Sequence, residues 1–209
     1  MKVLLINGSP KRSGCVDVAL REVEKGLHAN GVGTEMIWIG GGAVRGCIAC
    51  GACERLGKCV YDDAVNEIAE KFRDADGLVV GSPVYYGSPN GTLISLLDRL
   101  FYSTPFDKRM KVGASVVSCR RGGNTASFDV LNKYFTISEM PLASSCYWNQ
   151  IHGNTAQEAL ADKEGLRIMR TLGNNMAFLI KAIALGREQV GLPEAEPPAW
   201  TNFYKPGQE

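Results

Sequence analysis

The feature that most constrains this chain is an apolar run near its start, followed at once by a basic, Gly- and Ser-rich loop and then by a helical pattern. Residues 3–6 (Val-Leu-Leu-Ile) are typical of a buried strand, and from Val16 to Ala29 apolar residues recur at helical spacing. The loop between them runs from Asn7 to Cys15. This order predicts one unit of a parallel α/β fold, with the unpaired amides of the helix facing the loop.

That loop has the composition of an anion-binding site. Lys11 and Arg12 bring positive charge, Ser9 and Ser13 bring hydroxyl donors, and the dipole of the following helix adds to both. The spacing of its glycines is not that of a Walker loop, and the dinucleotide pattern G-x-G-x-x-G is missing. We therefore expect a single phosphate, as in a mononucleotide such as FMN. The alternative is an ordinary turn between a strand and a helix.

Further along the chain, strand and helix patterns alternate. Partial alternation predicts a second strand at residues 35–39, and apolar runs predict strands at 78–81 and 112–117. A fifth, weaker strand is predicted at residues 141–147. Helical patterns separate them, and a long helix is predicted from Ala156 to about Gly186. The alternation predicts an α/β fold, a doubly wound, five-stranded parallel sheet in the order 2-1-3-4-5 with helices on both faces.

Length and charge exclude several classes of protein. The chain has 209 residues and a net charge of +1, so no strong field favours nucleic acid or a membrane surface. No apolar run reaches transmembrane length, and the first strand begins too early for a signal peptide, so we expect a cytoplasmic protein. We expect one domain over residues 1–209, with a Cys-rich loop at 40–60 and a C-terminal helix and tail at 156–209. Its seven cysteines are then thiols, metal ligands or redox groups rather than disulfides.

Two further loops follow the third and fourth predicted strands, and in this sheet order they meet the first loop at one edge. In the segment 83–87 (Pro-Val-Tyr-Tyr-Gly), the rings can pack on a flavin face while backbone groups pair with its polar edge. In the loop 119–124, Arg120 or Arg121 can stabilise reduced flavin or bind the phosphate of a nicotinamide nucleotide. The alternatives are tyrosines that shield strand ends and arginines that are only surface charges.

All three loops therefore contribute candidate FMN-binding residues. These are Ser9, Lys11, Arg12, Gly14, Cys15, Val16, Pro83, Val84, Tyr85, Tyr86, Gly87, Cys119, Arg120, Gly122 and Gly123. Tyr85, Tyr86 and Arg120 are candidates for contacting the flavin ring and tuning its electronics. No acid–base catalytic residue is predicted, because the chemistry belongs to the cofactor.

Four cysteines stand in a compact run. Cys47, Cys50, Cys53 and Cys59 have the spacing C-x₂-C-x₂-C-x₅-C. Such a run can bind a [4Fe–4S] cluster, and the small residues between the first three let the chain wrap tightly. Two alternatives stay open. The cysteines can be buried free thiols, or they can bind zinc, although zinc-binding pairs are usually more widely separated.

Taken together, these motifs resemble the NADPH-dependent FMN reductase and iron–sulfur flavoprotein branch of the flavodoxin-like superfamily, over about residues 1–183. The matching segments are residues 8–12, the four-Cys run into Asp62-Asp63, residues 81–86 and Asp98-Arg99. The resemblance implies non-covalent FMN, with residues 83–87 at its ring and its phosphate held by Ser9, Lys11, Gly14 and Val16. It also implies reduction by NAD(P)H or a ferredoxin-type donor, and a homodimer or homotetramer.

One departure from the family pattern concerns the phosphate loop. Family loops often end in Gly-Asn-Ser/Thr, whereas Gly14 is followed here by Cys15 and Val16. The Cys15 side chain offers only a weak S–H donor, and the Val16 side chain offers no hydrogen-bond donor. Backbone amides and Ser9 then carry more of the binding, so we expect FMN to be held somewhat less firmly.

Three functions follow as hypotheses. The leading one is an FMN-dependent oxidoreductase that moves electrons from NAD(P)H to a quinone, a flavin or another small acceptor. The second is an FMN and [4Fe–4S] electron carrier that accepts electrons from ferredoxin. The third is a flavin-binding regulatory module with redox-sensing thiols.

For the assembly, the long helix from Ala156 and the aromatic residues Trp200 and Phe203 of the tail look suited to a subunit interface.

Overall fold

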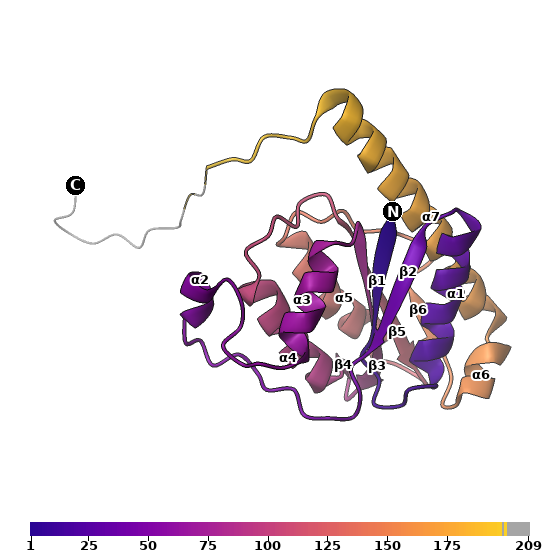
Figure 1. Ribbon diagram of the computed structural model, residues 1–209. Coiled ribbons are helices and arrows are strands. Elements are labelled where there is room, and N and C mark those ends of the chain that lie inside the picture. The colour runs from indigo at the N-terminus through magenta and orange to yellow at the C-terminus, as the bar shows by residue number, and fades with distance from the viewer. Residues whose placement is uncertain (198, 200–209) are drawn as a thin grey trace, which may run out of the picture.

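The computed structural model describes residues 1–197 and 199. Its sheet has the parallel strand order β2-β1-β3-β5-β6, which confirms the predicted order (Figure 1). The strands are β1 (Lys2–Asn7), β2 (Gly33–Trp38), β3 (Gly77–Tyr85), β5 (Val112–Cys119) and β6 (Gln150–His152). The two-residue β4 (Ser88–Pro89) pairs antiparallel with the end of β3.

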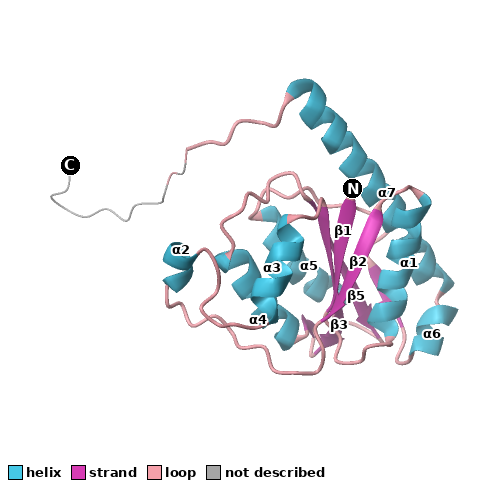
Figure 2. Ribbon diagram, in the orientation of Figure 1, coloured by secondary structure: helices cyan, strands magenta, loops and turns pink. Residues whose placement is uncertain are grey.

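Helices cover both faces of this sheet (Figure 1, Figure 2). One face carries α1 (Cys15–Ala29), α6 (Ala156–Ala161) and α7 (Lys163–Val190). The other carries α3 (Ala64–Arg73), α4 (Gly91–Ser103) and α5 (Asn124–Thr136), with the short α2 (Ala52–Leu56) outside them. Leu5 and Val79 pack toward α1 and α7, whereas Leu4 and Leu78 belong to the core under α3 and α4. Because both sides of the central strands β1, β3 and β5 are buried, these strands are largely apolar runs rather than alternating patterns.

Helices α1 and α7 approach each other closely. A Cβ placed on Gly173 would lie 2.3 Å from the carbonyl oxygen of Val23, so the two backbones touch there. Beside this contact, the buried Glu22 carboxylate pairs with Arg170 at 2.8 Å and also with Lys25. Burial opposes ionisation of Glu22, but the hydrogen bonds from these two cations outweigh it and lower the Glu22 pKa. The long helix is thereby fixed along the first βα unit.

Two of the predicted elements are placed differently by the structure. The predicted strand at 141–147 is wrong, because Leu142 makes only an isolated bridge to Gly113 and β6 forms later in the chain. The single helix predicted from Ala156 is two helices. Asp162 ends α6, and its carboxylate caps α7 by accepting a hydrogen bond from the Gly165 amide at 2.9 Å.

The remaining segments add little to the sheet. The predicted Cys-rich loop at 40–60 contains α2, which is flanked by Gly51 and Gly57 in left-handed conformations. Trp200 and Phe203, predicted to lie in a subunit interface, fall outside the described residues. Among the helices in the described part of the chain, none is long and apolar enough to span a membrane.

Candidate functional site

The loop between β1 and α1 is held in shape by its own side chains. The Asn7 carboxamide accepts a hydrogen bond from the Ser9 amide at 3.0 Å and donates one to the Arg12 carbonyl at 3.2 Å. The Ser9 hydroxyl accepts another from the Lys11 amide at 3.1 Å. From the end of β2, Trp38 donates its indole N–H to the Ser9 carbonyl at 2.8 Å. The loop is therefore organised in advance of any ligand, which lowers the cost of binding one.

The N-terminus of α1 opens onto this loop. Gly14 is the N-cap, and none of the described side chains caps the helix. Its first amides are therefore left for a ligand or for water, and the dipole of a 15-residue helix favours negative charge beside them. Gly14 also packs closely, since a Cβ there would lie 3.2 Å from the Lys11 Cβ. The arrangement suits a phosphate.

Three loops meet at the carboxyl ends of β1, β3 and β5. The Gly8 amide donates to the Gly81 carbonyl at 2.8 Å, and the Asn90 carboxamide donates to the Gly8 carbonyl at 2.7 Å. On the other side, Gly123 has φ +88° and packs against Gly87 with no room for a side chain. These contacts join the loops that the sheet order predicts to converge.

The joined loops surround a cavity of about 400 Å³, a volume typical of small-ligand sites. Most of the predicted FMN-binding residues line it, namely Ser9, Lys11, Gly14, Cys15, Val16, Pro83, Val84, Tyr85, Cys119 and Arg120. The charged side chains in this wall are Lys11 and Arg120, and no carboxylate is among the described lining residues. This donor set fits FMN. The two cations and the uncapped N-terminus of α1 can bind its phosphate, and Tyr85 and Val84 can pack against its ring.

The other predicted residues lie outside the cavity wall. The Arg12 guanidinium is directed over the Trp38 ring, 5.5 Å from its centroid. Tyr86 is fully exposed at the turn between β3 and β4. Gly87 and Gly123 contact each other without lining the cavity, and a Cβ on Gly122 would meet nothing within 4 Å. Of these residues, Gly87 and Gly123 shape the loops around the cavity through their mutual contact.

Sequence reasoning missed the segment after β6, where residues 153–157 line the cavity together with Ser13 and Ser118. The Cys15 thiol donates to the Thr155 carbonyl at 3.2 Å, which ties α1 to this segment. The signal is present as Gly-Asn-Thr directly after a short strand. A fifth strand predicted at 141–147 would end before residue 150, so residues 153–157 would not follow directly at the carboxyl edge of the sheet.

Cys119 lines the same cavity but is not prepared as a nucleophile. Burial raises the pKa of its thiol, in spite of a hydrogen bond from the Arg121 amide. A thiol that stays protonated at neutral pH is a poor nucleophile. The site therefore has the character of a binding cavity rather than of a covalent catalytic centre.

A second, much smaller cavity lies under the Cys-rich segment. All four cysteines of the compact run line it, Cys47, Cys50, Cys53 and Cys59. Cys47 and Cys50 are exposed, whereas the other two are partly buried. The cavity measures about 20 Å³, which is room for about one water molecule. Arg99, Tyr61 and Ser103 are among the other residues that line it.

The donor set of this cavity fits an iron–sulfur cluster, although the cavity itself is narrow. Among residues 1–197 and 199, no three His, Cys, Asp or Glu side chains gather closely enough to hold a metal ion. A [4Fe–4S] cluster places iron and sulfide between its cysteines, so it needs wider spacing and more room. Cys47 and Cys50 are exposed and lie outside the buried core. The Ser103 hydroxyl is also notable, because it is buried and has no partner among the described side chains.

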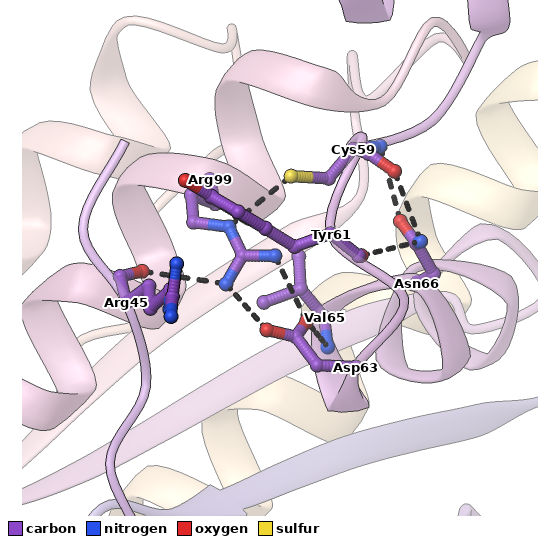
Figure 3. Close-up of polar contacts among 7 residues, drawn as sticks. All are labelled: Arg45, Cys59, Tyr61, Asp63, Val65, Asn66 and Arg99. Carbon is purple, nitrogen blue, oxygen red and sulfur yellow. Dashed lines mark hydrogen bonds and ion pairs between the residues drawn. The ribbon is translucent and has the colours of Figure 1, made fainter. Parts of the chain in front are cut away.

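Beside Cys59 lies a buried arginine, shown in Figure 3. Arg99, on α4, is 1% exposed and forms a two-pronged ion pair with Asp63, with distances of 2.7 and 2.8 Å. Its Nε donates to the Cys59 Sγ at 3.2 Å, and its side chain lies over the Tyr61 ring. Burial opposes ionisation of Asp63, but hydrogen bonds from Arg99 and the Val65 amide outweigh it and lower the Asp63 pKa. The pair is therefore charged at neutral pH.

Comparison with known proteins agrees with the flavodoxin-like fold and with the family that the sequence motifs resemble. The family model of NADPH-dependent FMN reductases matches residues 1–155. The chain is 33% identical to an iron–sulfur flavoprotein of Methanocaldococcus jannaschii, over 88% of this chain and 99% of that protein. It is 30% identical to an iron–sulfur flavoprotein of Methanosarcina thermophila, over 90% of this chain and 100% of that protein. A solved flavodoxin from the domain Archaea has the same fold, with a TM-score of 0.60 at 15% identity over 87% of this chain and 99% of that one.

Proposed function

We propose that this chain, which belongs to the NADPH-dependent FMN reductase family, is an FMN-dependent oxidoreductase that moves electrons from NAD(P)H to a quinone, a flavin or another small acceptor. One observation carries the proposal. The loops after β1, β3 and β5 are joined around a cavity of about 400 Å³ that has an uncapped helix N-terminus and two cations in its wall. FMN, when bound, supplies the electron-transfer chemistry, and the protein supplies binding and orientation.

The lining residues divide into two groups. The amides at the start of α1, with Ser9, Ser13 and Lys11, would hold the phosphate. Tyr85 would pack on the ring, and Arg120 would place positive charge near it. Because Tyr85 is 46% exposed, this side of the cavity is open to a nicotinamide or to an acceptor.

The experiment is flavin analysis followed by an activity assay. Purified protein, or deflavinated protein titrated with FMN, is expected to bind one FMN per chain and to oxidise NADPH when a quinone is added. The same assay with NADH gives the nicotinamide preference. A chain that carries no flavin and takes none up on titration would contradict the proposal.

A second candidate is an electron carrier that holds FMN and a [4Fe–4S] cluster and accepts electrons from ferredoxin. The observation that favours it is the single cavity lined by Cys47, Cys50, Cys53 and Cys59, and relatives at 33% and 30% identity are named iron–sulfur flavoproteins. Anaerobically prepared protein is then expected to contain iron and acid-labile sulfide. Cys53→Ser should lose both, whereas Cys146→Ser, an exposed cysteine outside the run, should keep them. Sub-stoichiometric iron and sulfide in the unaltered chain would reject this candidate.

We also infer a homodimer or homotetramer. Helix α7 leaves Phe178, Leu185 and Val190 exposed, and apolar side chains along one long helix are suited to contact with a second copy. Light scattering of the purified protein tests this, and a monomer at micromolar concentration would contradict it.

A further inference from the structure

Arg99 is a buried cation that donates hydrogen bonds to three other residues. Helix α4 places it in the wall of the four-cysteine cavity, at 1% exposure. Figure 3 shows its guanidinium between two partners of different kinds, with Asp63 on one side and the Cys59 sulfur on the other. A fourth hydrogen bond runs from Nη1 to the Arg45 carbonyl at 3.3 Å. The guanidinium thus connects three segments of the chain at the edge of this cavity.

The ion pair with Asp63 accounts for the charge of Arg99 but not for its bond to sulfur. Asp63 also caps α3, by accepting from the Val65 amide at 3.1 Å, so it has a structural role of its own. The Nε of Arg99 lies 3.2 Å from the Cys59 Sγ. A neutral thiol is a weak acceptor and gains little from a charged donor, whereas a thiolate or metal-bound sulfur is a good acceptor.

A second hydrogen bond from an N–H group to a cysteine sulfur lies in the same run. The Ala49 amide donates to the Cys47 Sγ at 3.4 Å, and Ala49 adopts φ +52°, a conformation that residues other than glycine seldom adopt. Donors are thus directed at two of the four sulfurs. Such hydrogen bonds, together with net charge, set the reduction potential of an iron–sulfur cluster.

We propose that Arg99 is a positioning residue for a [4Fe–4S] cluster on the four cysteines, that it orients the Cys59 sulfur toward the cluster, and that the Arg99–Asp63 pair sets the cluster's reduction potential. The inference rests on the second candidate function above. Reduction adds one electron to the cluster, with no bond formed or broken. The positive charge and N–H donor of Arg99 would stabilise the reduced form of such a cluster, whereas the carboxylate of Asp63 would offset part of that charge.

Substitutions of Arg99 and of Asp63 are therefore expected to shift the reduction potential in opposite directions, which a purely structural role of the pair would not produce. Arg99→Gln removes the cation and should make the cluster harder to reduce. Arg99→Lys keeps the charge but loses the planar fork and the Nε donor, so it should shift the potential in the same direction by less. Asp63→Asn keeps an oxygen for the Val65 amide, removes the offsetting charge and should make the cluster easier to reduce.

The experiment is an anaerobic potentiometric titration, followed by electron paramagnetic resonance, of the full chain reconstituted with iron, sulfide and FMN. For Arg99→Gln and Asp63→Asn we expect the ratio of reduced to oxidised cluster at fixed potential to change about tenfold in opposite directions, which is about 59 mV for one electron. Arg109→Gln is the matched control. Arg109 also forms a two-pronged pair with a neighbouring Asp, but it does not line the cysteine cavity.

Each result decides the question. Shifts of opposite sign, with no shift in the control, support the inference. A bound cluster whose potential is unchanged, or moves the same way in both variants, overturns the role of Arg99 and leaves the proposed function standing. An unaltered chain that binds FMN and oxidises NADPH but assembles no cluster on reconstitution overturns the inference and leaves the oxidoreductase proposal intact.

Discussion

Gly123 rests directly on Gly87, and a Cβ added to Gly123 would lie 2.7 Å from the Gly87 Cα. The contact joins the loop after β5 to the turn after β3, so it fixes the distance between two walls of the proposed FMN cavity. The left-handed backbone at Gly123, with φ +88°, is a second reason why a side chain is disfavoured there.

Gly123→Ala is therefore expected to weaken FMN binding while the sheet stays folded. Left-handed strain alone costs about 1–2 kcal/mol, which corresponds to roughly a tenfold loss of affinity if the loop shifts to relieve it. Equilibrium dialysis of the deflavinated protein measures the change. Gly122→Ala is the control, because a Cβ there meets nothing within 4 Å. Equal losses in both variants would show that the Gly123–Gly87 contact does not matter.

Lys11 and Arg12 carry the same charge but are expected to differ in binding. Lys11 lines the cavity, whereas the Arg12 guanidinium lies over Trp38. Lys11→Gln should weaken FMN binding by about tenfold, the scale of one charge-assisted hydrogen bond, and Arg12→Gln should weaken it much less. Neither change should affect binding of riboflavin, which lacks the phosphate. The outcome that contradicts this is a larger loss for Arg12→Gln, or equal losses for FMN and riboflavin with Lys11→Gln.

Gly173 and Gly186 both lie in α7, yet replacing them with alanine should have effects of opposite sign. A Cβ on Gly173 would clash with the Val23 carbonyl at 2.3 Å, so Gly173→Ala should lower the free energy of unfolding by about 2–3 kcal/mol. A Cβ on Gly186 meets nothing within 4 Å, so Gly186→Ala should raise it by about 0.5–1 kcal/mol. Urea unfolding followed by circular dichroism measures both, and a stable Gly173→Ala protein would mean that α1 and α7 can separate without cost.

Glu22 is expected to contribute to acid unfolding. Its pKa is lowered in the folded state by Lys25 and Arg170, so its contribution to stability is present above the ordinary Glu pKa and is lost as the pH falls through the lowered value. Between about pH 5 and pH 3, the free energy of unfolding should therefore fall less steeply in Glu22→Gln than in the unaltered chain. At pH 7 the variant should be less stable by about 1 kcal/mol, because the amide accepts weaker hydrogen bonds. Parallel pH profiles for the two proteins would rule out a contribution from Glu22.

The sheet could be predicted from the sequence because β1, β3 and β5 contain buried apolar runs and the pattern at β2 alternates partly. The fifth could not be placed from composition. Residues 141–147 look more apolar than Gln150–His152, but only Ile151 of β6 is fully buried, and an edge strand of this length leaves little signal. That error hid the loop 153–157, and with it one wall of the cavity.

In the candidate site, residue types were predictable but side-chain directions were not. Nothing local distinguishes Lys11 from Arg12, since the direction of Arg12 depends on Trp38, which arrives from another strand. The setting of Arg99 is likewise assembled from α4, the N-cap of α3 and the Cys-rich segment. Such contacts depend on how distant segments pack, and single-sequence patterns carry no information about that.

The bond from the Trp38 indole to the Ser9 carbonyl has a practical consequence. Trp38 contacts the loop between β1 and α1 through this 2.8 Å hydrogen bond, and it is not among the described residues that line the proposed FMN cavity. Indole emission responds to its hydrogen bond and to nearby charge, and Arg12 lies over the same ring. The chain thus carries an intrinsic fluorophore placed to report, without any label, when the loop around Ser9 changes its state.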